Sequence, residues 1–161
     1  MPDRPDEMRR NGRPLVPDFD ALEWFYYRVD PAFVQEGRFL DPISVKCTCP
    51  AVSSNRQRLS QPWYVLYPRT RFGTWAVFKF QRERLPQSVQ ADVPGATVFT
   101  LVTEHDPRED NYGHCETRLY RGTEKVVEAQ VNKQAKNSFR LSFARALEFE
   151  RAPGLPFPPT M

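Results

Sequence analysis

The chain contains little cysteine and no long apolar run, and each shortage narrows what the protein can be. Its three cysteines are an odd number, and Cys47 and Cys49 are separated by one residue instead of the two found in redox and zinc motifs. The first residues are charged, unlike the apolar core of a secretory signal. No stretch approaches the roughly 18 apolar residues that cross a bilayer. We therefore expect a cytoplasmic protein with no transmembrane segment, whose cysteines pack inside the fold.

The motifs that define common enzymes are also missing. The sequence has no glycine-rich phosphate-binding loop and no recognised nucleophile motif. Its two histidines, His105 and His114, are nine residues apart, a spacing that matches no zinc signature. From this pattern we expect no cofactor and no metal site. The absences favour a protein that binds over one that catalyses, without deciding between them.

Aromatic and β-branched residues gather in short runs that are typical of β-strands. Aromatic residues make up 13% of the chain. Gly73 separates two of the runs, and prolines between 85 and 95 predict a loop. Segment 123–131 is compatible with either a strand or a helix. The run Trp24–Val29 favours a strand, with a helix capped by Asp18 as the alternative. The strands predicted from these runs are Trp24–Val29, Ile43–Cys47, Trp63–Tyr67, Thr74–Phe80, Thr97–Thr103 and Glu116–Tyr120.

The last third of the chain predicts one helix. From Asn132 onward, apolar residues recur at spacings of three and four, which is the pattern of an amphipathic helix. Asn132 or Asn137 would cap its start, and Pro153 prevents its continuation. Several strands followed by one helix predict a single α+β domain. We expect a largely antiparallel sheet with the C-terminal amphipathic helix packed on one face.

Both ends of the sequence are rich in proline. Half of the 16 prolines lie in segments 1–17 and 151–161, which contain few residues able to form a core. We expect these segments to be proline-rich tails, extended or disordered, flanking one globular domain at 18–150. The alternative is that a tail is an arm docked on the domain or on a partner.

Residues Thr103–Glu116 concentrate the side chains that proton transfer would need. They include both histidines, and a hairpin across this segment could bring the two imidazoles together. If the protein is an enzyme, His114 would be its general acid or base, with Asp110 or Asp106 orienting the imidazole. The alternative is a structural loop held by hydrogen bonds from its aspartates to the backbone. Adjacent residues of a strand point to opposite faces, so Cys115 and His114 are not expected to act together.

Segment 56–84 carries seven positive charges against one negative charge, with aromatic residues between them. On one face of a sheet, this pattern could bind single-stranded nucleic acid, because cations follow phosphates and aromatic rings stack on bases. The alternative is that strand alternation turns the aromatic residues into the core and the basic residues into water. We expect Ser53–Arg56 to form a polar loop, and Arg28, Arg56 and His114 could converge on an anionic group. The candidate binding residues are Arg28, Arg56, Trp63, Tyr64, Arg69, Arg71, Lys79 and Arg82.

Four short patterns resemble those of a group of small uncharacterised bacterial proteins. They are an arginine in the early strand, Ser-x-x-Arg at Ser53–Arg56, Asp-Pro at 106–107 and Asn-x-x-His at Asn111–His114. The resemblance covers residues 24–147. It implies a role for Arg28, Arg56 and His114, and it implies no activity.

These patterns support three hypotheses about function. The leading one is a non-enzymatic cytoplasmic binding protein whose basic and aromatic surface contacts nucleic acid or a protein partner. The alternative is a small enzyme acting on a phosphate-containing substrate, in which Arg28 and Arg56 hold the anion and His114 moves a proton. A third is a structural subunit of a larger protein assembly. The net charge of +3 is modest for a dedicated nucleic-acid binder.

Overall fold

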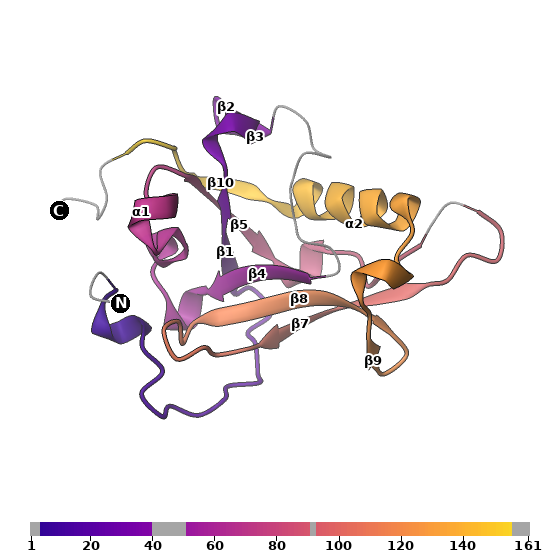
Figure 1. Ribbon diagram of the computed structural model, residues 1–161, viewed down its shortest axis with the longest axis horizontal. Coiled ribbons are helices and arrows are strands. Elements are labelled where there is room, and N and C mark those ends of the chain that lie inside the picture. The colour runs from indigo at the N-terminus through magenta and orange to yellow at the C-terminus, as the bar shows by residue number, and fades with distance from the viewer. Residues whose placement is uncertain (1–3, 40–50, 91–92, 156–161) are drawn as a thin grey trace.

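The structure is a large, curled antiparallel sheet with a C-terminal helix against one of its faces (Figure 1). It is a computed structural model that describes residues 4–39, 51–90 and 93–155. The predicted α+β class is confirmed. The predicted strand Ile43–Cys47, which includes the first cysteine of the Cys47/Cys49 pair, lies outside the described residues, as does Cys49.

The described residues form one large sheet, a separate hairpin, two α-helices and several short 3-10 helices. The large sheet contains β1 (Trp24–Val29), β4 (Ala51–Arg56), β5 (Ala76–Gln81), β6 (Ser88–Val89), β7 (Phe99–His105), β8 (His114–Arg121), β9 (Glu124–Lys125) and β10 (Glu148–Arg151). A separate hairpin is formed by β2 (Val34–Gln35) and β3 (Arg38–Phe39). The α-helices are α1 (Arg69–Phe72) and α2 (Lys133–Ala146). Short 3-10 helices are η1 (Asp6–Met8), η2 (Pro31–Phe33), η4 (Gln57–Leu59), η5 (Pro62–Leu66), η6 (Arg82–Arg84) and η7 (Glu128–Gln130).

The strand order decides which side chains meet on each face of the sheet. It runs β10-β5-β1-β4-β8-β7-β6, with β9 paired to β8. Tyr26 of β1 lies opposite Asn55 of β4, and Asn55 lies opposite His114 of β8. Residues opposite one another on antiparallel strands share a face. The first face of the sheet therefore carries Tyr26, Arg28, Asn55 and His114. The second face carries Phe25, Arg56 and the other core residues that alternate with them.

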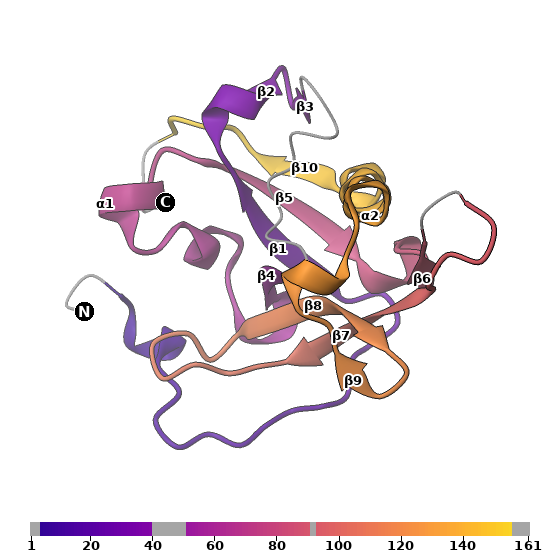
Figure 2. The same cartoon turned by 45° about the vertical axis from the view of Figure 1, so that its right-hand side comes forward.

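The second face carries the main core. Phe25 and Phe80 stack with their ring centroids 5.3 Å apart, and Phe143 of α2 meets Phe80 edge to face at 4.8 Å. Figure 2 shows α2 nearly end-on at this face, with α1 on the other side of β1 and β5. The side chain of Asn132 caps α2 by accepting a hydrogen bond from the Ala135 N–H at 2.8 Å, as predicted.

Over the ranges described above, no helix has the length and apolar character to cross a membrane.

The predictions for segments 63–67 and 53–56 are wrong. Segment 63–67 forms the 3-10 helix η5 instead of a strand. Pro62 starts this helix and Pro68 follows it, so the segment has prolines at both sides, where strand ladders would need N–H donors. Segment Ser53–Arg56, expected to be a polar loop, lies in the central strand β4. Hydrogen bonds satisfy the buried side chains of Asn55 and Arg56 there. Ser53 is exposed, and the buried Oγ of Ser54 has no partner in the described residues.

The described part of the N-terminal segment, residues 4–16, forms an arm that lies against the domain. Met8 is buried, and its carbonyl accepts a hydrogen bond from the Tyr112 N–H. The Tyr112 hydroxyl donates to the Pro14 carbonyl at 2.8 Å, and the Val16 N–H donates to Nδ1 of His105 at 2.9 Å. These bonds fasten residues 4–16 along the loop that joins β7 to β8.

Candidate functional site

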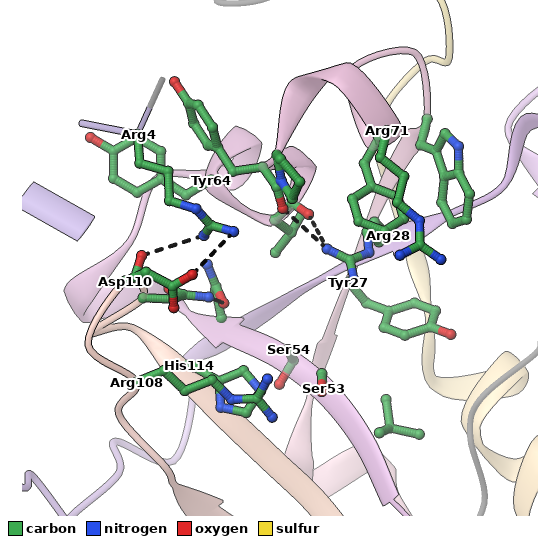
Figure 3. A pocket seen from close by; sticks show the side chains of 18 residues that line it. Arg4, Tyr27, Arg28, Ser53, Ser54, Tyr64, Arg71, Arg108, Asp110 and His114 are labelled. Atoms are coloured by element: carbon green, nitrogen blue, oxygen red, sulfur yellow. Dashed lines mark hydrogen bonds and ion pairs between the residues drawn. The ribbon is translucent and has the colours of Figure 1, made fainter. Parts of the chain in front are cut away.

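A pocket opens on the first face of the sheet, below η5 and α1. Its volume is about 420 Å³, within the usual range for small-ligand sites. Figure 3 shows Arg28 and Arg71 at one side, His114 with Ser53 and Ser54 at another, and Arg4 with Asp110 at the third. The charged lining residues are Arg4, Arg28, Arg71, Arg108 and Asp110, and the aromatic ones are Tyr27, Tyr64, Tyr67, Phe72 and Trp75. Four arginines against one aspartate make the pocket strongly positive.

Arg28 is the most constrained of these arginines. It projects from β1, and its Nη1 donates to the carbonyls of Val65 and Tyr67 at 3.0 and 3.4 Å. Its guanidinium carbon lies 3.5 Å from the ring centroid of Phe72, a cation–π contact. Burial lowers the pKa of Arg28 to about 10, so the side chain stays charged at neutral pH. No carboxylate of the described residues lies within ion-pair distance of it.

The other arginines differ in how fully their charge is neutralised. Arg71 is exposed on α1, and its guanidinium lies 4.9 Å from the Phe72 ring centroid, with no described carboxylate in range. Arg4 reaches from the arm to Asp110, bonding its carboxylate at 3.4 Å and its carbonyl at 3.3 Å. Arg108 contacts Asp106 only at 4.0 Å. The unneutralised charge is therefore concentrated at Arg28 and Arg71.

His114 carries a hydrogen-bond acceptor that nothing in the described protein uses. Its Nδ1 lies 2.8 Å from the carbonyl oxygen of Asp106 and 3.3 Å from Oδ2 of the same residue. A carbonyl can only accept, so Nδ1 carries the proton and Nε2 holds a lone pair. Burial lowers the pKa of His114, an effect that the Asp106 hydrogen bond opposes and the Arg108 charge reinforces, so the ring is neutral at pH 7. Nε2 is buried and has no partner in the described residues.

His105 has the opposite tautomer and a structural role. Its Nδ1 accepts the Val16 N–H, and its Nε2 lies 2.7 Å from the Tyr112 carbonyl, so Nε2 carries the proton. Both nitrogens are thus occupied. The two imidazoles do not combine into one site, because His105 fastens the arm whereas His114 lines the pocket.

Both histidines should make stability fall as the solution becomes mildly acidic. Burial lowers the pKa of His105 and of His114 in the folded chain, whereas the same side chains in the unfolded chain titrate near pH 6.5. As the pH drops below about 6.5, the unfolded state binds more protons than the folded state. The free energy of unfolding therefore keeps its full value above about pH 6.5 and decreases below it. Urea unfolding between pH 7.5 and pH 5.5 measures this decrease. A His105→Gln/His114→Gln variant should show a flatter profile, and an unchanged profile would contradict the assignment.

Cys115 is not a nucleophile. It pairs with Ser54 in the ladder while His114 pairs with Asn55, so the two neighbours point to opposite faces, as predicted. Burial raises the pKa of its thiol to about 12, which leaves no thiolate at neutral pH. Its side chain belongs to the main core.

The sequence-predicted binding residues do not form one surface. The pocket is lined by three of them, Arg28, Tyr64 and Arg71, and by the two catalytic candidates, His114 and Asp110. Asp110, however, pairs with Arg4, and Asp106 is the residue that accepts the hydrogen bond from the imidazole. The remaining candidates lie elsewhere. Arg56 is fully buried against Glu23, Lys79 pairs with Glu150, Arg82 lies over the Phe19 ring, Arg69 is exposed on α1, and Trp63 packs on the cluster around Val65 and Val77.

Two charged residues of the pocket were missed from the sequence. Arg4 lies in the proline-rich segment taken for a tail, and only the docking of the arm brings it to the pocket. Arg108 lies inside the histidine-containing segment, three residues after His105, so its position in the chain was a usable signal.

Of His, Cys, Asp and Glu side chains in the described ranges, no group of three or more is placed to hold a metal ion. Comparison of the chain with protein-family models, curated proteins and solved structures finds no significant match.

Proposed function

We propose that the protein is a cytoplasmic binding protein for a small phosphate-bearing ligand, held in the pocket between Arg28 and Arg71. The observation that supports this most directly is Arg28 itself. It is half-buried, fixed by two carbonyls and a ring, and without a carboxylate partner in the described residues. A buried charge is costly unless an opposite charge approaches it. An anion entering the pocket supplies that charge.

Phosphate is the anion that fits the charges best. A phosphate monoester carries about −1.5 to −2 at neutral pH and has three acceptor oxygens. Arg28 and Arg71 leave guanidinium donors for such oxygens, and arginine binds phosphate in a two-pronged geometry that lysine does not reproduce. The aromatic lining gives the ligand room for an apolar or ring-bearing portion. A ligand with both parts uses both kinds of lining.

Phenyl phosphate tests this proposal, because it combines the anion with a ring. We expect saturable binding by isothermal titration calorimetry at low salt. Arg71→Ala should weaken it about tenfold or more, since a hydrogen bond to a charged group contributes about 1.5–3 kcal/mol. Arg28→Lys keeps the charge and loses the fork, so it should also weaken binding.

Arg145→Ala is the matched control. Arg145 is exposed on α2 and does not line the pocket, so its removal changes the net charge equally and should leave the affinity unchanged. Equal losses in Arg71→Ala and Arg145→Ala would mean that overall charge, and not the pocket, attracts the anion. No binding of phenyl phosphate at low salt would refute the proposal.

Catalysis on a phosphate ester is the second candidate, favoured by the free lone pair on Nε2 of His114. A neutral imidazole of this kind can take a proton from a hydroxyl. Release of p-nitrophenol from p-nitrophenyl phosphate, compared between the natural chain and His114→Asn, decides whether His114 acts in this way. Contact with nucleic acid or a protein partner through a broad basic surface, and membership of a larger assembly, stay predictions. The first of these has less support, because its residues are divided among several elements.

A further inference from the structure

The pocket combines three kinds of recognition, and each restricts the ligand further. Arg28 and Arg71 fit a phosphate, as argued above. Tyr64 and Trp75 are half-buried aromatic residues of the lining, and such rings stack on planar bases. His114 adds a requirement of a different kind, because its Nε2 can only accept a hydrogen bond at neutral pH.

An unused buried acceptor has a cost that a ligand can remove. Leaving such a group without a donor destabilises the free protein, and most buried polar atoms have a partner. The imidazole is held in place by Asp106, so its lone pair has a fixed direction. The neighbouring Arg108 side chain is about half exposed and can change rotamer as a ligand arrives. A hydroxyl group on the ligand would donate to Nε2.

We infer that the ligand is a nucleotide unit with a free ribose hydroxyl, whose phosphate lies at Arg28 and Arg71 and whose hydroxyl donates to Nε2 of His114. This inference rests on the proposed function and deepens it by naming the ligand class. A nucleoside monophosphate supplies a phosphate, a planar base and vicinal hydroxyls in one molecule. His114 is then the residue that distinguishes a ribonucleotide from a nucleotide whose sugar lacks the 2′ and 3′ hydroxyls.

The test compares the four ribonucleoside 5′-monophosphates with their 2′,3′-dideoxy counterparts by isothermal titration calorimetry. We expect at least one ribonucleotide to bind about tenfold or more tightly than its dideoxy form. In His114→Asn, the amide N–H can still donate to Asp106 but the acceptor at the Nε2 position is gone, so the two forms should bind equally. His114→Gln places an amide oxygen near the Nε2 position and should restore part of the difference.

The outcomes separate this inference from the proposal beneath it. Equal binding of ribo and dideoxy forms to the natural chain, with affinity still lost in Arg71→Ala, would overturn the inference and leave the phosphate pocket standing. No binding of any nucleotide or of phenyl phosphate would overturn both. Competition between the bound mononucleotide and a short RNA, with and without a 5′-phosphate, shows whether the natural source is a free nucleotide or the end of a strand.

Discussion

Replacing Arg56 with methionine should destabilise the fold by about 3–5 kcal/mol, the cost of leaving the partner of a buried ion pair unpaired. The Arg56 side chain is fully buried, and its Nε and Nη2 each lie 2.9 Å from a Glu23 carboxylate oxygen. Its Nη1 and Nη2 also donate to the carbonyls of Val16 and Asp18, at 2.7 and 2.8 Å. One guanidinium thus joins the central strand to the segment before β1. Removal leaves the buried Glu23 carboxylate without its cation, with only the Arg58 N–H among the described residues still donating to Oε1, at 3.2 Å, and it takes one donor from each of the two carbonyls.

A double variant separates the ion pair from the packing around it. Arg56→Met/Glu23→Leu removes both charges, so it should recover part of the stability lost in Arg56→Met alone. Arg58→Ala is the control, since Arg58 is exposed on η4, and it should change the free energy of unfolding by less than about 0.5 kcal/mol. Urea unfolding measures all three. A loss in Arg56→Met no larger than in Arg58→Ala would show that the Arg56–Glu23 pair does not stabilise the fold.

Replacing Phe143 with alanine should cost a similar amount, about 3–5 kcal/mol, for a different reason. Phe143 is fully buried. Its ring centroid lies 5.4 Å from that of Tyr27, 4.8 Å from that of Phe80 and 6.2 Å from that of Phe139. The variant loses the transfer free energy of the ring and leaves a cavity between α2 and the sheet. Because Tyr27 also lines the pocket, a collapse of this cavity would reach the candidate site.

An exposed leucine provides the control for this test. Leu22 is 72% exposed, so Leu22→Ala should change stability by less than about 0.5 kcal/mol. Phe143→Leu keeps most of the volume and should lose less than the alanine variant. Thermal and urea unfolding with nucleotide present and absent would show whether the cavity also weakens the pocket. A Phe143→Ala protein as stable as Leu22→Ala would mean that α2 contributes little to the core.

The elements predicted correctly are those that local patterns define. The helix from Asn132 was visible because its cap and its periodic apolar residues are neighbours in the chain. Strand β1 was visible as the aromatic run Trp24–Val29. The run at 63–67 has the same composition, yet it folds as η5, because its flanking prolines disfavour a ladder. Composition alone therefore identifies burial better than it identifies the element.

The candidate site was half predictable for a related reason. His114 and Asp106 are close in sequence, and Asp106 was one of the two aspartates predicted to orient the imidazole. The other, Asp110, pairs with Arg4 instead. Arg56 was grouped with the surface cations because its partner, Glu23, lies in a distant segment. Arg4 reaches Asp110 only through the docked arm. Contacts between distant segments leave no trace in a local pattern.

The strand order also sets how quickly this chain can fold. Among the described residues, the longest hairpin between sequence neighbours joins β7 to β8. In contrast, β1 pairs with β5 through Trp24 and Gln81, and β5 pairs with β10 through Lys79 and Glu148. Sheets built from remote pairings fold slowly, in milliseconds to seconds, because loop closure precedes the contacts that reward it. We expect the β7–β8 hairpin to form early. During synthesis, β5 gains its second neighbour only after β10 has left the ribosome, so one edge of the sheet stays open until then.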